Sequence, residues 1–379
     1  MSGVTGARSI RSVRGARAAC LRAPVLGLVF LAMAACDVSG QRATQPPARA
    51  DQQSNGRVDH RAKTSVEKFE WRASNSAPKG CPIDIISGDF YFPGGGGLYI
   101  PTAGIHAGWG REVSAHVVGP DQKSLPDSME VVFFSYLEDR FYRGRFALPR
   151  DSIARLFAQG YRSFLTPSGH ATYDALVAGV APGGAVAVWA SGGERQVEVF
   201  FGKAEPADLD WHRAMDAPPT VDRRGFVTSS LAEAAQSDPL VPIMMQHVPV
   251  GRWAAYRTRY HWRPAFEGID RPERLDRVEF VNGERDYILL QPAGSGDVAR
   301  PAPRFLIVDE ARDKTSYRVS FDEQEITEAF AYLGAEGKPF ELVFVKAARD
   351  GKPTLDVLVR DATETVPLRK AAVQAYGAG

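Results

Sequence analysis

The sequences LPRDSIARLFAQG (148–160) and TYDALVAGVAPGGAVAVWAS (172–191) decide the fold class. In the first, Ile153 and Phe157 lie four residues apart and Gly160 follows as a stop, which predicts a short helix with one apolar face. The second holds two apolar runs around a Pro-Gly-Gly turn, a pattern typical of two paired strands. A single helix flanked by paired strands predicts an α+β fold.

The same order of elements recurs near the C-terminus. FDEQEITEAFAYLG (321–334) places Ile326 and Phe330 on one helical face behind the capping residue Asp322. It is followed by FELVFVKAARDGKPTLDVLV (340–359), which is a strand, a turn with glycine, and a strand. We therefore predict a mostly antiparallel β-sheet with a few packed helices, in two pseudo-repeated strand–helix–strand–strand halves. A chance likeness within a β-rich chain is the alternative.

The two halves are expected over residues 66–205 and 206–379, with the boundary in the polar, proline-bearing segment 204–224. Short aromatic and β-branched runs separated by Gly, Pro or Asp predict strands in both halves. The clearest of these runs are KFEW (68–71), PIDIIS (82–87), GDFYF (88–92), GLYIP (97–101) and MEVVFFSY (129–136).

Two further local patterns carry predictions. PGGGG (93–97) lies between two strand-like runs, so a hairpin turn is expected there rather than a phosphate-binding loop. In SSLAEAA (229–235), Ser230 and Glu233 have the spacing of a capping box, which predicts that a helix begins at this point.

The N-terminus has the features of an export signal. Residues 1–35 contain five arginines and no acidic residue, and they end in the apolar run 23–35, which is too short to span a bilayer. Small residues directly before Cys36 resemble a lipobox, so we expect residues 1–35 to be a lipoprotein signal peptide and Cys36 to be the lipidated residue. A plain cleavable signal with a chance cysteine is the alternative. Residues 36–65 lack aromatic residues and are expected to form a flexible tether.

Charge and cysteine content narrow the classes of partner. The whole chain has a formal net charge of +1, and loss of the five arginines of the signal would make the remainder acidic. Nucleic acid is therefore not an expected partner. Loss of Cys20 and acylation of Cys36 would leave Cys81 as the remaining free cysteine, so no disulfide is expected.

Catalytic patterns are weak. His106 with His116 could ligate a metal, and Ser168 with His170 could be a nucleophile and its base, but neither pair has a third partner at recognisable spacing. We expect no enzymatic activity, no metal site and no cofactor.

RWAAYRTRYHWRP (252–264) contains the strongest candidate binding residues. If the stretch is one strand, the alternation of side chains places an aromatic row on one face. The opposite face then carries a basic row, which consists of Arg257, Arg259, His261 and Arg263. This basic row could bind carboxylates of a partner protein. The alternative is that it forms salt bridges with acids of neighbouring strands, such as those in RPERLDRVEF (271–280).

Several stretches together resemble a family of bacterial lipoproteins catalogued as domain of unknown function 2931. They are Trp71 with SAP (76–78), GWG (108–110), FFSYLEDRFYRGRFALPRDSIARLF (133–157), TYDALVAGVAPGG (172–184), RYHWRP (259–264), NGE (282–284) and FDEQEITEAF (321–330). The resemblance covers about residues 66–376. It implies a chain found near interbacterial toxin secretion systems, where anchored lipoproteins can neutralise an incoming toxin.

Taken together, these patterns favour an envelope-anchored lipoprotein that faces the periplasm and binds a protein partner in the manner of a toxin-immunity protein. A structural or assembly lipoprotein of the envelope is the alternative, and a hydrolase is a weaker one. The membrane is an expected partner through the lipid on Cys36. Asp37 favours the inner membrane, but the outer membrane stays open.

Overall fold

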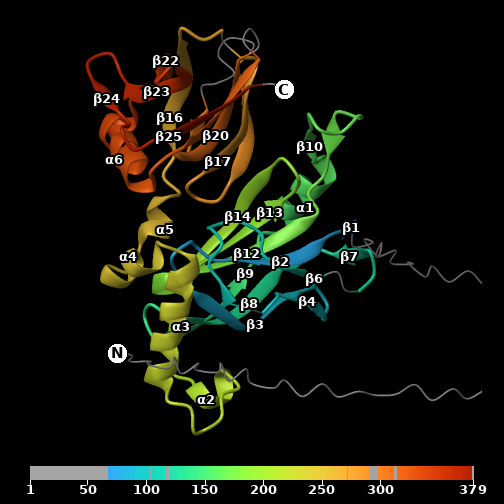
Figure 1. Cartoon of the computed structure of the whole chain (residues 1–379). Helices are drawn as coiled ribbons and strands as arrows, with labels where there is room; N and C mark the ends of the chain where they lie inside the picture. Colours follow the sequence, from blue (N-terminus) through green and yellow to red (C-terminus); the bar gives the residue numbers. More distant parts are fainter. Residues whose placement is uncertain are drawn as a thin grey trace, which may run out of the picture. The chain divides into compact units, whose positions relative to one another are not determined.

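Paired strands make up most of the chain, and helices lie between them (Figure 1). The structure is a computed structural model that describes residues 67–377, apart from 103, 117–118, 271, 291–297 and 311–313. The predicted α+β class with mostly antiparallel sheet is confirmed. The predicted signal peptide, the tether and Cys36 lie outside the described residues. Within the described part, no helix is long and apolar enough to cross a bilayer.

Ten strands and one helix form the first half of the fold. Five of these strands form the order β14-β13-β12-β2-β6, and the other five form β15-β9-β8-β3-β4. Their bounds are β2 Arg72–Ser76, β3 Ile83–Tyr91, β4 Gly97–Tyr99, β6 Ala115–His116, β8 Ser128–Ser135, β9 Arg140–Ala147, α1 Arg150–Gln159, β12 Ala175–Ala181, β13 Ala185–Ser191, β14 Gln196–Lys203 and β15 Glu205–Ala207.

The second half repeats this pairing order strand for strand. Its strands form β24-β23-β22-β16-β19 and β25-β21-β20-β17-β18. In each half one pair is parallel, β2 with β12 and β16 with β22, and the other pairs are antiparallel. The bounds are β16 Tyr260–Glu267, β17 Arg274–Phe280, β18 Arg285–Leu289, β19 Ala299–Arg300, β20 Pro303–Glu310, β21 Thr315–Ser320, α6 Glu323–Leu333, β22 Phe340–Arg349, β23 Lys352–Arg360, β24 Thr365–Pro367 and β25 Ala372–Gly377. A common origin of the halves by duplication stays a prediction.

The halves meet where β14 pairs with β18 at one position, Gln196 opposite Arg285, which makes one ten-stranded sheet. Other described helices and strands lie outside the shared order, and most are short, whereas α3 has 15 residues. They are β1 Lys68–Glu70, β5 Gly104–Ile105, β7 Gln122–Ser124, β10 Tyr161–Arg162, β11 His170–Ala171, α2 Trp211–Ala214, α3 Arg223–Ser237, α4 Val241–Gln246 and α5 Arg252–Ala255.

The two predicted helices are α1 and α6, and their apolar faces are buried as expected. Phe157 of α1 lies 5.6 Å from Phe69 and 6.0 Å from Tyr173 between ring centroids. Phe330 of α6 lies 5.6 Å from Trp262 and 4.8 Å from Phe340. Each phenylalanine is thus held by aromatic rings on both sides, which fixes its helix to a sheet.

The predicted capping box at Ser230 and Glu233 is wrong. Both residues lie inside α3, which begins at Arg223 because the carboxylate of Asp222 accepts a hydrogen bond of 2.6 Å from the backbone N–H of Gly225.

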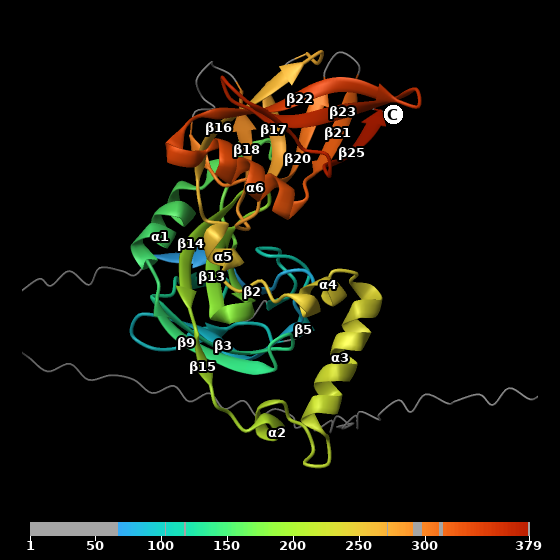
Figure 2. The same ribbon diagram turned by 90° about the vertical axis from the view of Figure 1, so that its left-hand side faces the viewer.

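Helices α2 to α4 cover the outer face of β8 and β9, where their apolar residues share one cluster with Phe134 and Phe141 (Figure 2). In addition, β15 pairs with β9, so residues 205–207 belong to the first half by strand pairing.

The turn predicted at residues 93–97 joins β3 to β4 in the structure. The runs PIDIIS and GDFYF form one continuous strand, β3, and the glycine-rich stretch 93–97 makes the turn to β4 as predicted. The turn is closed by a hydrogen bond of 3.0 Å from the N–H of Phe92 to the carbonyl of Gly96. Cys81 is buried, and burial raises the pKa of its thiol to about 12.

Candidate functional site

The stretch 252–264 is not one strand, which corrects the prediction. A short helix, α5, occupies Arg252–Ala255 after Gly251, whose φ of +85° starts the turn. Strand β16 begins only at Tyr260, so the expected alternation of faces holds from there onward. Trp262 is buried and His261 is exposed, whereas Arg257 and Arg259 project from the turn that joins α5 to β16.

Each arginine of the basic row is paired with a glutamate from another element. Arg257 Nε lies 2.5 Å from Glu198 Oε1 of β14. Arg259 binds both carboxylate oxygens of Glu284, at 2.8 and 2.7 Å. The third pair joins Arg263 to Glu341 of β22 at 2.8 Å. The acids of residues 271–280 are therefore not the partners of these arginines, as had been expected, but the arginines do form salt bridges.

The three glutamates differ in burial, and this decides what each arginine contributes. The side chain of Glu198 is 7% exposed, and burial raises its pKa although Arg257 acts in the opposite direction. For Glu341, which is 24% exposed, burial also favours the neutral form, but hydrogen bonds from Arg360 and Arg263 outweigh it and lower the pKa. Glu198 therefore depends on one arginine, whereas Glu341 has two.

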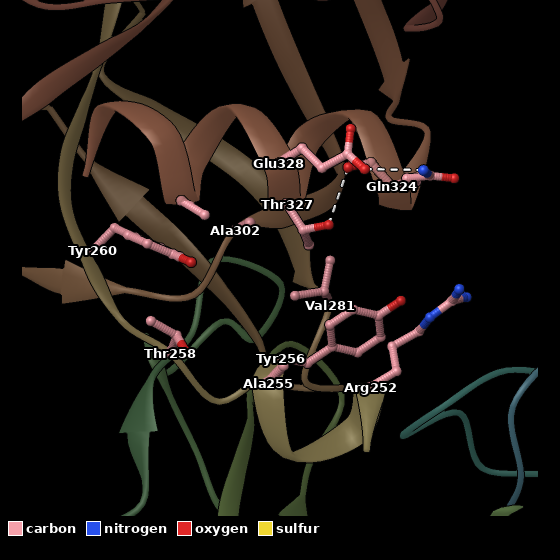
Figure 3. A pocket seen from close by; sticks show the side chains of 11 residues that line it. Arg252, Ala255, Tyr256, Thr258, Tyr260, Val281, Ala302, Gln324, Thr327 and Glu328 are labelled. Atoms are coloured by element: carbon pink, nitrogen blue, oxygen red, sulfur yellow. Dashed lines mark hydrogen bonds between the residues drawn. The ribbon is translucent and has the colours of Figure 1, made fainter. Parts of the chain in front are cut away.

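A pocket of about 280 Å³ lies beside the basic row, between α5 and α6 (Figure 3). Of the expected aromatic core face, Tyr256 and Trp262 are buried in the core and Tyr260 packs against it. Tyr256, Thr258 and Tyr260 also line one wall of the pocket. The opposite wall carries Thr327 and Glu328 of α6. The predicted core face is thus in part a solvent-accessible wall.

The hydroxyl of Tyr256 is held in place from α6. Its Oη donates a hydrogen bond of 2.7 Å to Glu323 Oε2. Burial and the nearby charge of Glu323 both raise the pKa of Tyr256, so the phenol stays protonated at neutral pH. The pocket therefore presents neutral hydroxyl groups beside the guanidinium of Arg252, which also lines it, and this combination suits hydrogen bonding and ion pairing with a partner.

The weaker catalytic candidates are not assembled for catalysis. The hydroxyl of Ser168 donates to the carbonyl of His170, and His170 Nε2 lies 2.9 Å from the carbonyl of Gln159. His106 Nδ1 lies 3.3 Å from Asp238 Oδ2. Among the residues that the structure describes, no three His, Cys, Asp or Glu side chains are grouped to hold a metal.

The junction of the halves was missed by sequence reasoning. Gln196 Nε2 donates to the carbonyls of Gly110 and Gly283, at 2.7 and 2.5 Å. The motifs GWG and NGE, which lie far apart in the chain, therefore meet at this point. Their glycines were a signal of close backbone approach, but sequence alone did not indicate which segments approach each other.

Comparison with known proteins gives one match. The family model described as "Protein of unknown function (DUF2931)" matches residues 45–237. No curated protein and no solved structure matches the chain.

The burial of Glu198 predicts that the arginines of the row differ in their effect on stability. Arg257→Ala should lower the free energy of unfolding by about 1–3 kcal/mol, because a buried carboxylate loses its ion pair. Arg263→Ala should change it by less than about 0.5 kcal/mol, because Glu341 keeps Arg360. Urea denaturation at pH 7 measures both values.

Two controls separate this cause from a general loss of packing. Glu198→Gln in the Arg257→Ala background should recover much of the loss, since it removes the unpaired charge. The pKa of Glu198 is raised in the folded state, so the folded protein gains stability as the pH falls through that pKa, and the deficit of Arg257→Ala should shrink between pH 7 and about pH 5. Equal losses for the two arginine variants at all pH values would contradict the account.

Proposed function

The chain belongs to the DUF2931 family, and we propose that it is an envelope-anchored bacterial lipoprotein that binds a protein partner, in the manner of a toxin-immunity protein. One observation carries the choice of binding surface: His261 and Arg263, which we call the exposed rim, lie on the face of β16 opposite to the buried Trp262, and the Arg263 side chain is 69% exposed. Tyr260 of the same strand lines the α5–α6 pocket. Arginine and tyrosine are enriched at the centres of protein interfaces.

The exposed rim can bind a partner without breaking the fold. Arg263 and His261 lie on the exposed side of β16, whereas Trp262 between them is buried. An acidic group of a partner could pair with Arg263 while Glu341 stays paired with Arg360 at 2.9 Å. A preformed binding surface needs residues that the fold holds in place and residues that are exposed to a partner, and β16 provides both.

The anchor part of the proposal rests on residues 1–65 of the sequence. A lipid on Cys36 and a tether of about 30 residues with a reach on the order of 30 Å would hold the folded body at the membrane surface in the periplasm. A periplasmic position is where an incoming toxin would be met.

A structural or assembly lipoprotein is the second candidate. It is favoured by one different surface, the segment 242–250, where Ile243, Met245 and Val250 are all exposed. Exposed apolar side chains that gather in this way often mark contacts with other proteins. The two proposals therefore predict binding through different surfaces.

The binding proposal is tested with the protein encoded by the adjacent gene. Arg263→Ala, alone and with His261→Ala, should weaken its affinity by about tenfold or more, and added salt should weaken wild-type binding. Arg349→Ala is the matched control, because this exposed arginine of the neighbouring strand β22 also has one acidic partner, Asp356. Unchanged affinity in the rim variants, or a loss caused only by Ile243→Ser, would assign binding to another surface.

The anchor is tested by cell fractionation. Cys36→Ala should move the protein from the membrane fraction to the soluble fraction, because the acyl chains can no longer be attached. Cys81→Ala should leave it in the membrane fraction, because Cys81 is buried in the fold. A Cys36→Ala protein that still sediments with membranes would show that the lipobox interpretation is wrong.

A further inference from the structure

A second and larger groove lies between the β10–β11 loop and the sheet of the second half. Its volume is about 690 Å³, and it shares no lining residue with the α5–α6 pocket. Phe164 and Leu165 contribute one wall, and residues of β17, β18, β20 and β21 contribute the other. We refer to it as the Arg285 groove, after the arginine at its inner end.

Arg285 is a half-buried cation whose charge is not neutralised by a direct carboxylate partner among the described residues. Its guanidinium donates to the carbonyl of Gly192 at 2.8 Å, and its buried Nε has no hydrogen-bond partner in the described structure. Burial lowers the pKa of this guanidinium. Burial of an unpaired guanidinium costs free energy, and an anion bound beside Arg285 would offset that cost.

The nearest carboxylate is already shared by other arginines. Arg277, Arg304 and Arg111 lie 3.4, 3.5 and 3.9 Å from oxygens of Glu279. These residues line a smaller cavity of about 200 Å³, and both Arg277 and Arg285 also line the groove. Arg277 and Arg285 thus contribute guanidinium groups to both the groove and this cavity, whose lining also holds the carboxylates of Glu112, Glu279 and Glu284.

The acidic residues that line the groove are Glu194, Asp276, Asp286 and Asp309, and each of them already has a partner: Glu194 accepts a hydrogen bond of 3.0 Å from the backbone N–H of Phe164. Asp276 accepts a hydrogen bond of 2.6 Å from Arg274, and Asp286 lies 3.3 Å from Arg195. Asp309 accepts from the hydroxyl of Ser316 at 2.5 Å. Burial raises the pKa of both Asp276 and Asp286.

Aromatic rings line the outer part of the groove. The rings of Phe164 and Tyr287 lie 4.7 Å apart in an edge-on contact, and Arg274 Cζ lies 4.0 Å from the Phe164 ring centre. Tyr376 is exposed beside Arg318, whose Cζ lies 4.4 Å from its ring. Rings next to cations can hold a flat apolar group of a ligand whose anionic end reaches the arginines.

We propose that the Arg285 groove binds a small organic oxyanion, with its phosphate or carboxylate at Arg285 and a ring or similarly flat group against Phe164 and Tyr287. Guanidinium groups bind both oxyanions through paired N–H donors. The site does not depend on the proposed protein partner, since the two surfaces have no residue in common.

Calorimetric titration of the purified full-length protein in detergent tests the proposal. The probes are phenyl phosphate, benzoate and inorganic phosphate, with benzyl alcohol as the neutral analogue. Phenyl phosphate or benzoate should bind at least about tenfold more tightly than inorganic phosphate, and benzyl alcohol should not bind. Whichever aromatic anion binds more tightly identifies the preferred oxyanion.

Variants show whether binding uses the groove. Arg285→Gln should weaken the aromatic anion by about tenfold or more. Arg318→Gln, at an exposed position whose loss does not threaten folding, should weaken it several-fold, and Phe164→Ala should remove the advantage over inorganic phosphate. Arg349→Gln on β22 should have no effect. Absence of binding by both aromatic anions at millimolar concentration, or equal binding by wild type, Arg285→Gln and Arg318→Gln, would overturn the proposal.

Discussion

The amide of Gln196 holds the two halves of the sheet together by donating to the carbonyls of Gly110 and Gly283. This contact requires two glycines, because a Cβ on Gly110 would lie 2.6 Å from the Cα of Gly283, and both residues have positive φ. Trp189 reinforces it with a hydrogen bond of 3.2 Å from its indole N–H to the carbonyl of Asn282. Apolar packing also joins the halves, because Trp109 and Trp189 of the first half share one buried cluster with Phe280 and Val281 of the second.

Two arginines of the basic row, Arg257 and Arg259, and the Arg285 groove lie next to this junction. Glu284 follows Gly283 directly and holds Arg259, while Glu198 lies two residues beyond Gln196 and holds Arg257. Arg285, at the inner end of the groove, is the residue that pairs with Gln196. The positions of Arg257, Arg259 and Arg285 therefore depend on the same contact, which gives the motifs GWG (108–110) and NGE (282–284) a structural role.

Sequence reasoning identified what is determined locally. Helices α1 and α6 were predicted because their apolar residues recur at helical spacing, and the turn at 93–97 because its glycines permit positive φ. The start of α3 was missed because its cap, Asp222, precedes a helix whose apolar residues form no clear stripe. The ion pairs of the basic row could not be assigned, since Arg257 and Arg263 find partners 59 and 78 residues away. Only the pairing order of the strands brings these residues together.

The most direct measurement is the calorimetric unfolding of Gly283→Ala, compared with wild type and with Gly351→Ala. Gly351 also has positive φ but has open space around it, so that variant reports backbone strain alone. At Gly283 a Cβ would lie 2.9 Å from the Trp189 ring and should force the halves apart. Because Trp109 and Trp189 of the first half share one buried cluster with residues of the second half, we expect a single transition for each protein, at a clearly lower temperature for Gly283→Ala than for Gly351→Ala. A single transition of Gly283→Ala at the wild-type temperature would contradict the account.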